Sequence, residues 1–236
     1  MSTTPTLTPE EQLLSRLLSL AVHELRTPVT VVAGYLRMLL REQDGPLSDK
    51  QRRMIEEADR SCARIGAIVS EISDVGKLES SEFALGRQNF DFATLVAEVA
   101  SDMHDGDDRG VRLESRGTDQ PLMVTGDRAR LAATVRALMQ AAVRERGEPG
   151  VIVAECSAIT DSNPPWAVLT IGAEPLLPSL ADQARGNPPS FDEWRGGLGL
   201  ALPVGRRVIE ALGGSLWSAS GTQSRAASAL RLPLNS

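Results

Sequence analysis

The sequence is poor in aromatic residues and cysteine and has no excess of positive charge, and each of these features excludes a class of function. Phe, Trp and Tyr make up 3% of the 236 residues, so the stacking surfaces that bind single-stranded nucleic acid are not expected. The net charge of -6 gives no electrostatic reason to expect binding to nucleic acid, which requires a basic patch or stripe. The two cysteines, Cys62 and Cys156, provide neither a disulfide framework nor a metal-binding pair. A reducing, cytoplasmic setting is the default that follows.

Long apolar runs are missing as well. The stretch 13–22 is interrupted by Ser15 and Arg16, and no run approaches the length of a membrane span. Residues 1–10 lack the charged and apolar blocks of a signal peptide. We therefore expect a chain that its own sequence neither exports nor anchors in a membrane, with residues 1–9 as a disordered N-terminus.

The sequence does contain two long amphipathic helical patterns within residues 10–80. The first begins at Thr8-Pro9, with acids in its first turn, and is expected to run to about Glu42 with a kink at Pro28. His23 falls two residues past an inward position of this pattern, so we expect its imidazole on the outer edge of the helix. The pattern is a heptad seam, with apolar residues in alternating steps of four and three, at Leu14, Leu18, Ala21, Leu25, Pro28, Val32, Tyr35 and Leu39.

The second helical pattern follows the break at Asp44-Gly45-Pro46 and opens at Ser48-Asp49. It carries two apolar stripes, and two stripes indicate contact with more than one neighbour. The stripes are Ile55, Ala58, Cys62, Ile65, Val69 and Ile72, and beside them Met54, Ser61, Ile68 and Val75. We predict an antiparallel helical hairpin that forms a homodimeric four-helix bundle, with His23 on its outer face.

From residue 88 to 234 the pattern changes to short strands and helices. Strands are expected near 90–92, 111–114, 122–124, 151–155, 167–171, 215–218 and 229–232, and helices at 93–103, 127–146 and 197–212. The stretch 173–196 is rich in Pro, Gly and polar residues and is expected to be a mobile loop. This pattern predicts an α/β sandwich, in which helices cover one face of a mixed sheet.

The run His23-Glu24-Leu25-Arg26-Thr27-Pro28 resembles the phosphoacceptor box of the sensor histidine kinases of two-component signalling. The resemblance covers nearly all the chain. It implies a dimerisation and histidine phosphotransfer hairpin at 10–80 and a catalytic ATP-binding-like domain of the histidine kinase ATPase type at 88–234. Gly197-Leu198-Gly199-Leu200, followed by Gly213-Gly214, is similar to the family's second glycine box, and 191–195 resembles the aromatic box of its ATP lid.

The resemblance assigns a role to three residues of the hairpin. His23 would accept the phosphoryl group on an imidazole nitrogen. Glu24 would orient the ring and take its proton. Thr27, one turn along, would position a water molecule for phosphatase action.

The residues that would hold ATP and magnesium depart from the family's pattern. The glycines Gly197 and Gly199 would present bare N–H groups at a helix N-terminus to phosphate, and Arg144 stands where the family usually has lysine. Ala141, however, stands where an asparagine usually holds magnesium, and Gly172 where an aspartate usually binds the adenine.

Losing one such hydrogen bond costs on the order of 1.5–3 kcal/mol, so binding of ATP and magnesium is expected to be impaired. Ala137, the other usual asparagine position, offers no replacement, and Glu174 is the nearby carboxylate that could reach the adenine instead. The acidic run 104–108 lacks the spacing of a calcium loop and is expected to be a solvated turn, so no metal site is predicted.

We therefore expect a phosphorelay protein, phosphorylated on His23, that exchanges phosphoryl groups with the aspartate of a response-regulator receiver domain. Its other expected partners are a second copy and an upstream sensor kinase, without nucleic acid or membrane. Three hypotheses stay open: a histidine phosphotransferase with impaired ATP binding, a soluble ATP-dependent sensor histidine kinase, and a non-catalytic pseudokinase scaffold that binds response regulators. The complete acceptor box favours phosphoryl chemistry, and the two missing anchors favour the phosphotransferase.

Overall fold

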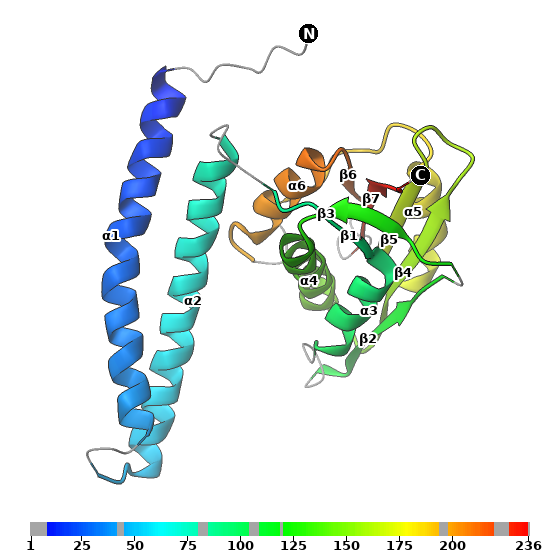
Figure 1. The fold of residues 1–236 in the computed structure, drawn as a ribbon. Coiled ribbons are helices and arrows are strands. Elements are labelled where there is room, and N and C mark those ends of the chain that lie inside the picture. Colours follow the sequence, from blue (N-terminus) through cyan, green and yellow to red (C-terminus); the bar gives the residue numbers. More distant parts are fainter. Residues whose placement is uncertain are drawn as a thin grey trace. The chain divides into compact units, whose positions relative to one another are not determined.

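The computed structural model describes residues 9–41, 45–79, 85–103, 109–118, 120–193, 198–219 and 227–235. The chain divides into two compact units, Met1–Ala84 and Leu85–Ser236 (Figure 1). Among the helices of the described ranges, none is both long enough and apolar enough to cross a lipid bilayer.

The first unit is a helical hairpin of α1 (Pro9–Leu40) and α2 (Asp49–Glu79), close to the predicted bounds. Ser48 and Gln51 fix the start of α2 as a reciprocal capping box. The Ser48 N–H donates to Gln51 Oε1 at 3.0 Å, and the Gln51 N–H donates to Ser48 Oγ at 3.4 Å. Along the hairpin the two helices meet closely, since the buried Cys62 thiol donates to the Val29 carbonyl at 3.4 Å.

The stripe of α1 that packs against α2 is not the predicted heptad seam. The packed residues are buried Val22 and the half-buried Val29, Ala33, Leu36 and Leu40. The seam residues from Ala21 onwards are all exposed, and they lie roughly 80° around the helix from the packed stripe, because an α-helix turns about 100° per residue. A heptad pattern indicates which side of a helix is apolar, but it does not say which neighbour covers that side.

α2 shows the same division between packed and exposed apolar residues. Ile55, Cys62, Val69 and Ile72 are buried or half-buried, whereas Met54, Ala58, Ser61, Ile65 and Ile68 are exposed. In each helix the exposed stripe precedes the packed stripe by roughly 80°. Antiparallel helices turn in opposite senses when viewed from one end, so both exposed stripes lie on the same side of the hairpin. We call this side the apolar face: Leu25, Val32, Leu39, Met54, Ile65 and Ile68.

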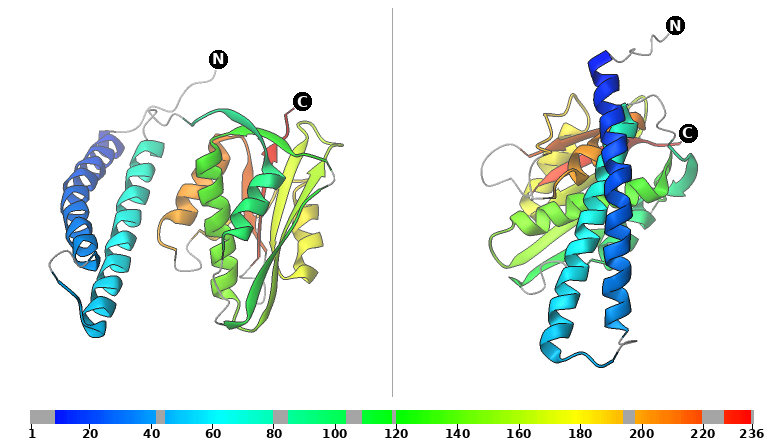
Figure 2. Two further views of the ribbon diagram at one scale, coloured as in Figure 1. Left: turned by 60° about the horizontal axis from the view of Figure 1, so that its bottom comes forward. Right: turned by 90° about the vertical axis from the view of Figure 1, so that its left-hand side faces the viewer.

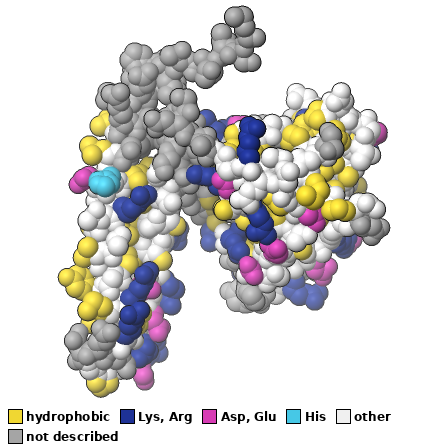
Figure 3. Space-filling view, viewed as in Figure 1, with side chains coloured by type: hydrophobic (Ala, Val, Ile, Leu, Met, Phe, Trp, Pro, Cys, Tyr) yellow, Lys and Arg dark blue, Asp and Glu magenta, His cyan; other side chains and the backbone are white. Residues whose placement is uncertain are grey.

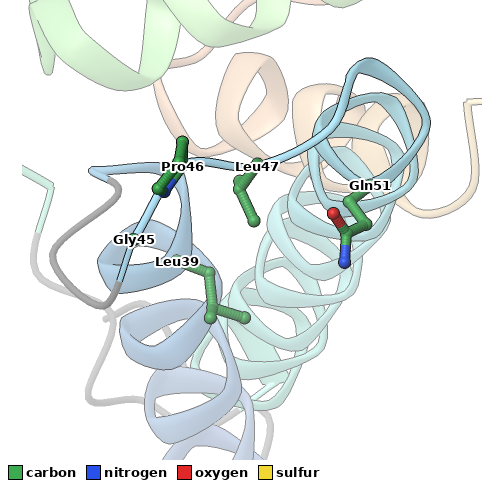
Figure 4. Close-up of a pocket in the computed structure, with 5 residues that line it drawn as sticks. All are labelled: Leu39, Gly45, Pro46, Leu47 and Gln51. Atoms are coloured by element: carbon green, nitrogen blue, oxygen red, sulfur yellow. The ribbon is translucent and has the colours of Figure 1, made fainter.

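The turn end of the apolar face carries a hollow of about 330 Å³ (Figure 4). Leu39, Leu47 and Gln51 point into it, and Gly45 and Pro46 form its rim. Because Gln51 also belongs to the capping box of α2, the hollow is held between the end of one helix and the start of the other.

The second unit contains a five-stranded mixed sheet. Its strands are β2 (Val111–Arg116), β4 (Gly150–Ile159), β5 (Trp166–Gly172), β7 (Ser228–Pro233) and β6 (Ser215–Ser218), in this order across the sheet. β2 and β4 are parallel, and the other neighbours are antiparallel. A separate antiparallel pair joins β1 (Gln88–Asp91) to β3 (Met123–Gly126).

Helices cover both faces of this sheet, not one face as the sequence predicts (Figure 2). α3 (Phe92–Ser101), α4 (Arg128–Glu145) and α6 (Ala201–Ala211) cover one face. The other face is covered by α5 (Leu177–Gln183), which follows a 3-10 turn at Glu174–Leu176. α5 therefore occupies part of the predicted mobile loop.

Burial of apolar side chains explains why α5 forms there. Leu180 and Ala184 pack in a core cluster with Val168 of β5, Trp217 of β6 and Ala229 of β7. Trp217, Leu180 and Ala184 are completely buried in this cluster. The gain from burying such side chains, about 25 cal/mol per Å² of apolar surface, outweighs the weak helical propensity of the segment.

Asp91 ties the start of α3 to the entry of β3. Its carboxylate accepts hydrogen bonds from the N–H groups of Ala93 at 3.1 Å and Leu122 at 2.8 Å, and from the Thr94 hydroxyl at 2.5 Å. Burial raises the pKa of Asp91, but the hydrogen bonds from Thr94 and the backbone together outweigh burial, so its pKa lies below the ordinary value. Asp127 begins α4 in a similar way by accepting from the Arg130 N–H at 3.1 Å.

Candidate functional site

His23 is an exposed residue on the surface of α1, as the sequence predicts. It is the one histidine within the described ranges, and it lies at the surface of the hairpin (cyan in Figure 3). No hydrogen bond or ion pair to the described part of the chain holds this ring. An imidazole in this setting is open to a reacting group from another molecule.

The packing of the hairpin determines the direction of His23. It follows Val22, which faces α2, by one residue and therefore lies about 100° around the helix from the packed stripe. Val32 and Leu39 of the apolar face lie roughly 80–100° from the packed stripe in the opposite direction around the helix. His23 and the apolar face are thus on opposite sides of α1.

Glu24 and Thr27, the two other predicted residues of the hairpin site, are also exposed. Thr27 follows His23 by four residues, so the two side chains are neighbours on one face of the helix. Glu24 is adjacent in the sequence and lies about 100° further round. The three residues therefore lie at neighbouring positions on one exposed side of α1.

Pro28 follows directly, and α1 continues through it without a break. Proline has no N–H, so the carbonyl of Glu24 receives no hydrogen bond from position 28. In the next turn Thr30 Oγ1 donates to the Arg26 carbonyl at 2.8 Å. Pro28 therefore lies inside a continuous helix, and its local effect is the loss of one backbone hydrogen bond beside His23, Glu24 and Thr27.

On α4, the two positions where the family pattern has asparagine are closely packed. Ala137 is 5% exposed and Ala141 is 1% exposed. Both belong to the buried side of the helix, together with Leu138 and Thr134. Arg144 is exposed in the last turn of α4, where a positive side chain interacts favourably with the helix dipole.

At the end of β5, Gly172 is buried against the start of β7. A Cβ added at Gly172 would lie 2.8 Å from the Cβ of Ala227 and 3.9 Å from Leu177 Cδ2. Since non-bonded carbon atoms separate at about 3.5–4.0 Å, Ala227 fills the space that a larger side chain at 172 needs. Sequence analysis missed Ala227, because no local pattern links it to a residue so far away along the chain.

Glu174, the alternative carboxylate near the adenine position, is paired with Arg116. The distance from Arg116 Nη1 to Glu174 Oε1 is 2.7 Å, and this pairing raises the pKa of Arg116. Both side chains are well exposed, so the pair is held weakly. Glu174 therefore points towards the end of β2.

The glycines of the predicted phosphate-binding run are only partly described. Gly197 lies outside the described residues. Gly199 has a φ of 62°, in the left-handed region that favours glycine, and α6 starts two residues later at Ala201. The helix thus begins four residues after the predicted start.

Neither a metal cluster nor a reactive thiol is found in the described ranges. Among these residues no group of three or more His, Cys, Asp or Glu side chains is placed to hold a metal ion. The acidic run 104–108 lies outside the described residues. Burial raises the pKa of Cys156 to about 12, with smaller contributions from the charges of Asp91 and Glu155, so its thiol is neutral.

Comparison with known proteins places the hairpin in a defined domain family. Residues 13–81 match the His Kinase A (phospho-acceptor) domain. This range spans α1 from its second turn, all of α2, and the surface that carries His23, Glu24 and Thr27.

The chain is also similar to curated kinases. It is 29% identical over 203 residues to the signal transduction histidine-protein kinase BarA of Escherichia coli (strain K12). This alignment covers 82% of this chain and 22% of BarA. It is 29% identical over 225 residues to the probable sensor histidine kinase TcrY of Mycobacterium tuberculosis, covering 91% of this chain and 45% of TcrY. The chain thus spans about a fifth to a half of the length of these relatives.

Two solved structures share the fold. Full-length ShkA in complex with AMPPNP aligns with a TM-score of 0.68 and 19% identity over 98% of this chain and 47% of ShkA. The Acinetobacter baumannii histidine kinase AdeS aligns with a TM-score of 0.56 and 20% identity over 91% of this chain and 98% of AdeS. The phosphoacceptor-type hairpin, the matching fold and these relatives together support the sensor histidine kinase family for this chain.

Proposed function

We propose that this chain is a phosphorelay protein of two-component signalling, and that His23 carries the phosphoryl group. The observation that supports this most is the position of His23. It is exposed on the side of α1 opposite the apolar face, has no hydrogen bond or ion pair to the described residues, and has Glu24 and Thr27 beside it. The partner is the receiver domain of a response regulator. We place the protein in the cytoplasm, where the two buried free cysteines stay reduced.

The chemistry follows from the imidazole and its neighbour. The lone pair of one ring nitrogen attacks the phosphorus of a receiver's aspartyl phosphate, an N–P bond forms, and the P–O bond to the aspartate breaks. The leaving group is the aspartate carboxylate, and the proton on the other ring nitrogen passes to Glu24 or water. The same steps in reverse return the phosphoryl group, so flow in both directions is expected.

A second copy of the chain covers the apolar face in this proposal. Of the twelve large hydrophobic side chains exposed in the described ranges, eleven lie on the hairpin, and six of these form the apolar face. A contiguous apolar surface on two helices favours association, and a four-helix bundle is the usual solution. Because His23 lies on the opposite side of α1, such a dimer leaves it accessible.

We infer further that the chain is a histidine phosphotransferase with impaired ATP binding, because its residues do not fit the nucleotide as the family's pattern requires. Ala141 offers a buried methyl group where a magnesium ligand is expected. At Gly172 the space for a carboxylate is filled by Ala227. Glu174, the possible replacement, is paired with Arg116.

Two other functions compete with the phosphotransferase. An ATP-dependent histidine kinase is favoured by the complete ATP-binding-like fold and by the likeness to ShkA, whose structure contains AMPPNP. A non-catalytic scaffold that binds response regulators is favoured only by the loss of the nucleotide anchors. The intact His23-Glu24-Leu25-Arg26-Thr27-Pro28 run argues against the scaffold, since binding alone does not need it.

One labelling experiment separates the three. The full chain is incubated either with radiolabelled ATP and magnesium or with receiver domains that carry a labelled aspartyl phosphate. The phosphotransferase takes label from a receiver and not from ATP. Label from ATP would establish the kinase, and label from neither donor would leave the scaffold.

Matched variants show whether the label is on His23. His23→Ala removes labelling if His23 is the acceptor. Thr30→Ala, a change on the same exposed side of α1, is the control and should leave labelling intact. Glu24→Gln should slow transfer by about 10²–10⁴-fold if Glu24 acts as the general base.

A further inference from the structure

The chain between α5 and α6 is fastened to the rest of its unit by several polar contacts. We call residues 184–193 the strap. It includes Phe191-Asp192-Glu193, the described part of the run that resembles the aromatic box of the ATP lid. A lid that closes on a nucleotide has few contacts when empty, so the contacts of the strap decide whether it behaves as a lid.

The first end of the strap is held by two arginines. Arg231 of β7 donates to the Gly186 carbonyl at 3.0 Å and to the Ala184 carbonyl, and its guanidinium lies 4.4 Å from the ring centre of Trp166. Arg185 donates to both carboxylate oxygens of Asp161 at 2.7 Å, which lowers the pKa of Asp161. The C-terminal end of α5 is thereby capped and fixed to the sheet.

The second end is held by an ion pair with α6. Arg206 Nε lies 2.6 Å from Glu193 Oε2, and Arg206 Nη1 lies 3.3 Å from Glu210 Oε1. The Glu193 and Arg206 side chains are 20% and 33% exposed, whereas those of the hairpin pair Glu57–Arg60 are 71% and 65% exposed. Because water screens the Glu193–Arg206 pair less, it contributes more than an ordinary surface pair.

Between these ends the strap pairs with the edge of the sheet. β6 is an edge strand, with β7 as its one neighbour in the five-stranded sheet. The N–H of its buried residue Ser218 donates to the Ser190 carbonyl at 3.3 Å, and Ser218 Oγ accepts from the Asp192 N–H at 3.0 Å. The strap thus satisfies the Ser218 N–H, a backbone group that an open edge would leave to water or to another chain.

We propose that the strap is a permanently closed latch, with Glu193–Arg206 as its clasp, and that it orders this part of the unit without any nucleotide. Its closed state is built from contacts within the protein, so ATP and magnesium are not needed to close it. This inference goes beyond the proposed function, because it concerns the conformational state of the second unit and not the source of the phosphoryl group.

Hydrogen–deuterium exchange on the full chain tests the latch, with and without Mg–ATP. The wild-type strap amides are expected to be protected without nucleotide, and equally protected with it. Glu193→Gln removes the charge but keeps the shape, and should speed exchange in the strap about three- to tenfold. Glu57→Gln breaks an ion pair of the same 2.6 Å length on α2 and is the matched control, without effect on the strap.

Two further variants keep the test decisive. Ser218→Ala should speed exchange of the Asp192 amide, since that amide loses its acceptor. Arg206→Lys keeps the charge but loses the fork geometry, and replaces Glu193→Gln if circular dichroism shows that variant unfolded. The proposal is overturned if the wild-type strap exchanges like an unstructured peptide, if Mg–ATP adds protection, or if the folded clasp variant exchanges like wild type.

Failure of the latch and failure of the proposed function give different results. Labelling of His23 by a phosphorylated receiver is measured on the same samples. An open strap with intact labelling rejects the latch alone, and a protected strap without labelling from the receiver rejects the phosphotransferase alone.

Discussion

Replacing Gly172 by the aspartate of the family pattern is expected to destabilise the second unit without creating an ATP site. The added Cβ would lie 2.8 Å from the Cβ and 3.3 Å from the Cα of Ala227. Carbon atoms in contact separate at about 3.5–4.0 Å, so β7 or the end of β5 has to move. Since Ala227 and Gly172 are both buried, little room exists for that movement.

The size of the effect can be worked out in two parts. Overpacking a buried position costs about 1–3 kcal/mol. Burying a carboxylate without a hydrogen-bond partner adds at least another 1–3 kcal/mol. We therefore expect Gly172→Asp to lower the free energy of unfolding by about 2–6 kcal/mol, and Gly172→Ala, which tests overpacking alone, by about 1–3 kcal/mol. Ala227→Gly should restore much of the loss in the alanine variant.

Tryptophan fluorescence during urea unfolding measures this unit separately. All three tryptophans of the chain, Trp166, Trp194 and Trp217, belong to Leu85–Ser236, and Trp217 is completely buried. Excitation at the red edge of the absorption band leaves out Tyr35 of the hairpin. A Gly172→Asp protein with wild-type stability and with Mg–ATP binding by calorimetry would refute the reasoning, because it would mean that position 172 has room for the carboxylate.

Three other changes probe the hairpin, a cap and a buried thiol. Val32→Asp on the apolar face should raise the dissociation constant of the proposed dimer at least about tenfold, as measured by light scattering. Thr30→Asp, on the other side of α1, should leave it unchanged. Equal effects of the two changes would contradict the assignment of the face. Asp91→Asn should lower the free energy of unfolding by about 1–2 kcal/mol at neutral pH. The pKa of Asp91 is lowered in the folded state, so its stabilisation is present above the unfolded pKa near about 4 and is lost as the pH falls through the folded value. A difference between the two proteins that persists at strongly acidic pH would count against this. The pKa of Cys156 is raised to about 12, so its thiol should react with a thiol reagent at neutral pH only as fast as the unit unfolds. Peptide mass spectrometry follows this reaction. Rapid labelling of the folded protein would contradict the burial of Cys156.

The sequence predicts the elements of this fold well where the information is local. The periodicity of the two long helices, the capping box at Ser48 and the cap at Asp127 each lie within a few residues of the structure they determine. The sequence does not predict α5, because Pro178 and the nearby Gly and Pro residues are typical of a loop. Its buried residues Leu177, Leu180 and Ala184 repeat in steps of three and four, and that pattern is the signal that could have revealed it.

The candidate site likewise has local features that the sequence predicts and non-local features that it does not. The outward direction of His23 and its closeness to Thr27 follow from helix geometry alone. Which side of α1 packs against α2 does not, because that depends on a partner helix distant in the sequence, as the contact between Cys62 and Val29, 33 residues apart, shows. Ala227 beside Gly172 and Arg116 beside Glu174 are equally non-local, since strands that are distant in the sequence bring them together.

In the function proposed for this chain, the phosphoryl group reaches His23 from another protein. The most direct measurement incubates the full chain, without ATP, with receiver domains labelled on aspartate, and maps the phosphate by mass spectrometry under conditions that preserve phosphohistidine. Phosphate is expected on His23, and no phosphate is expected in the His23→Ala variant. Phosphate that appears on His23 only when ATP and magnesium are supplied, and from no receiver tested, would contradict it.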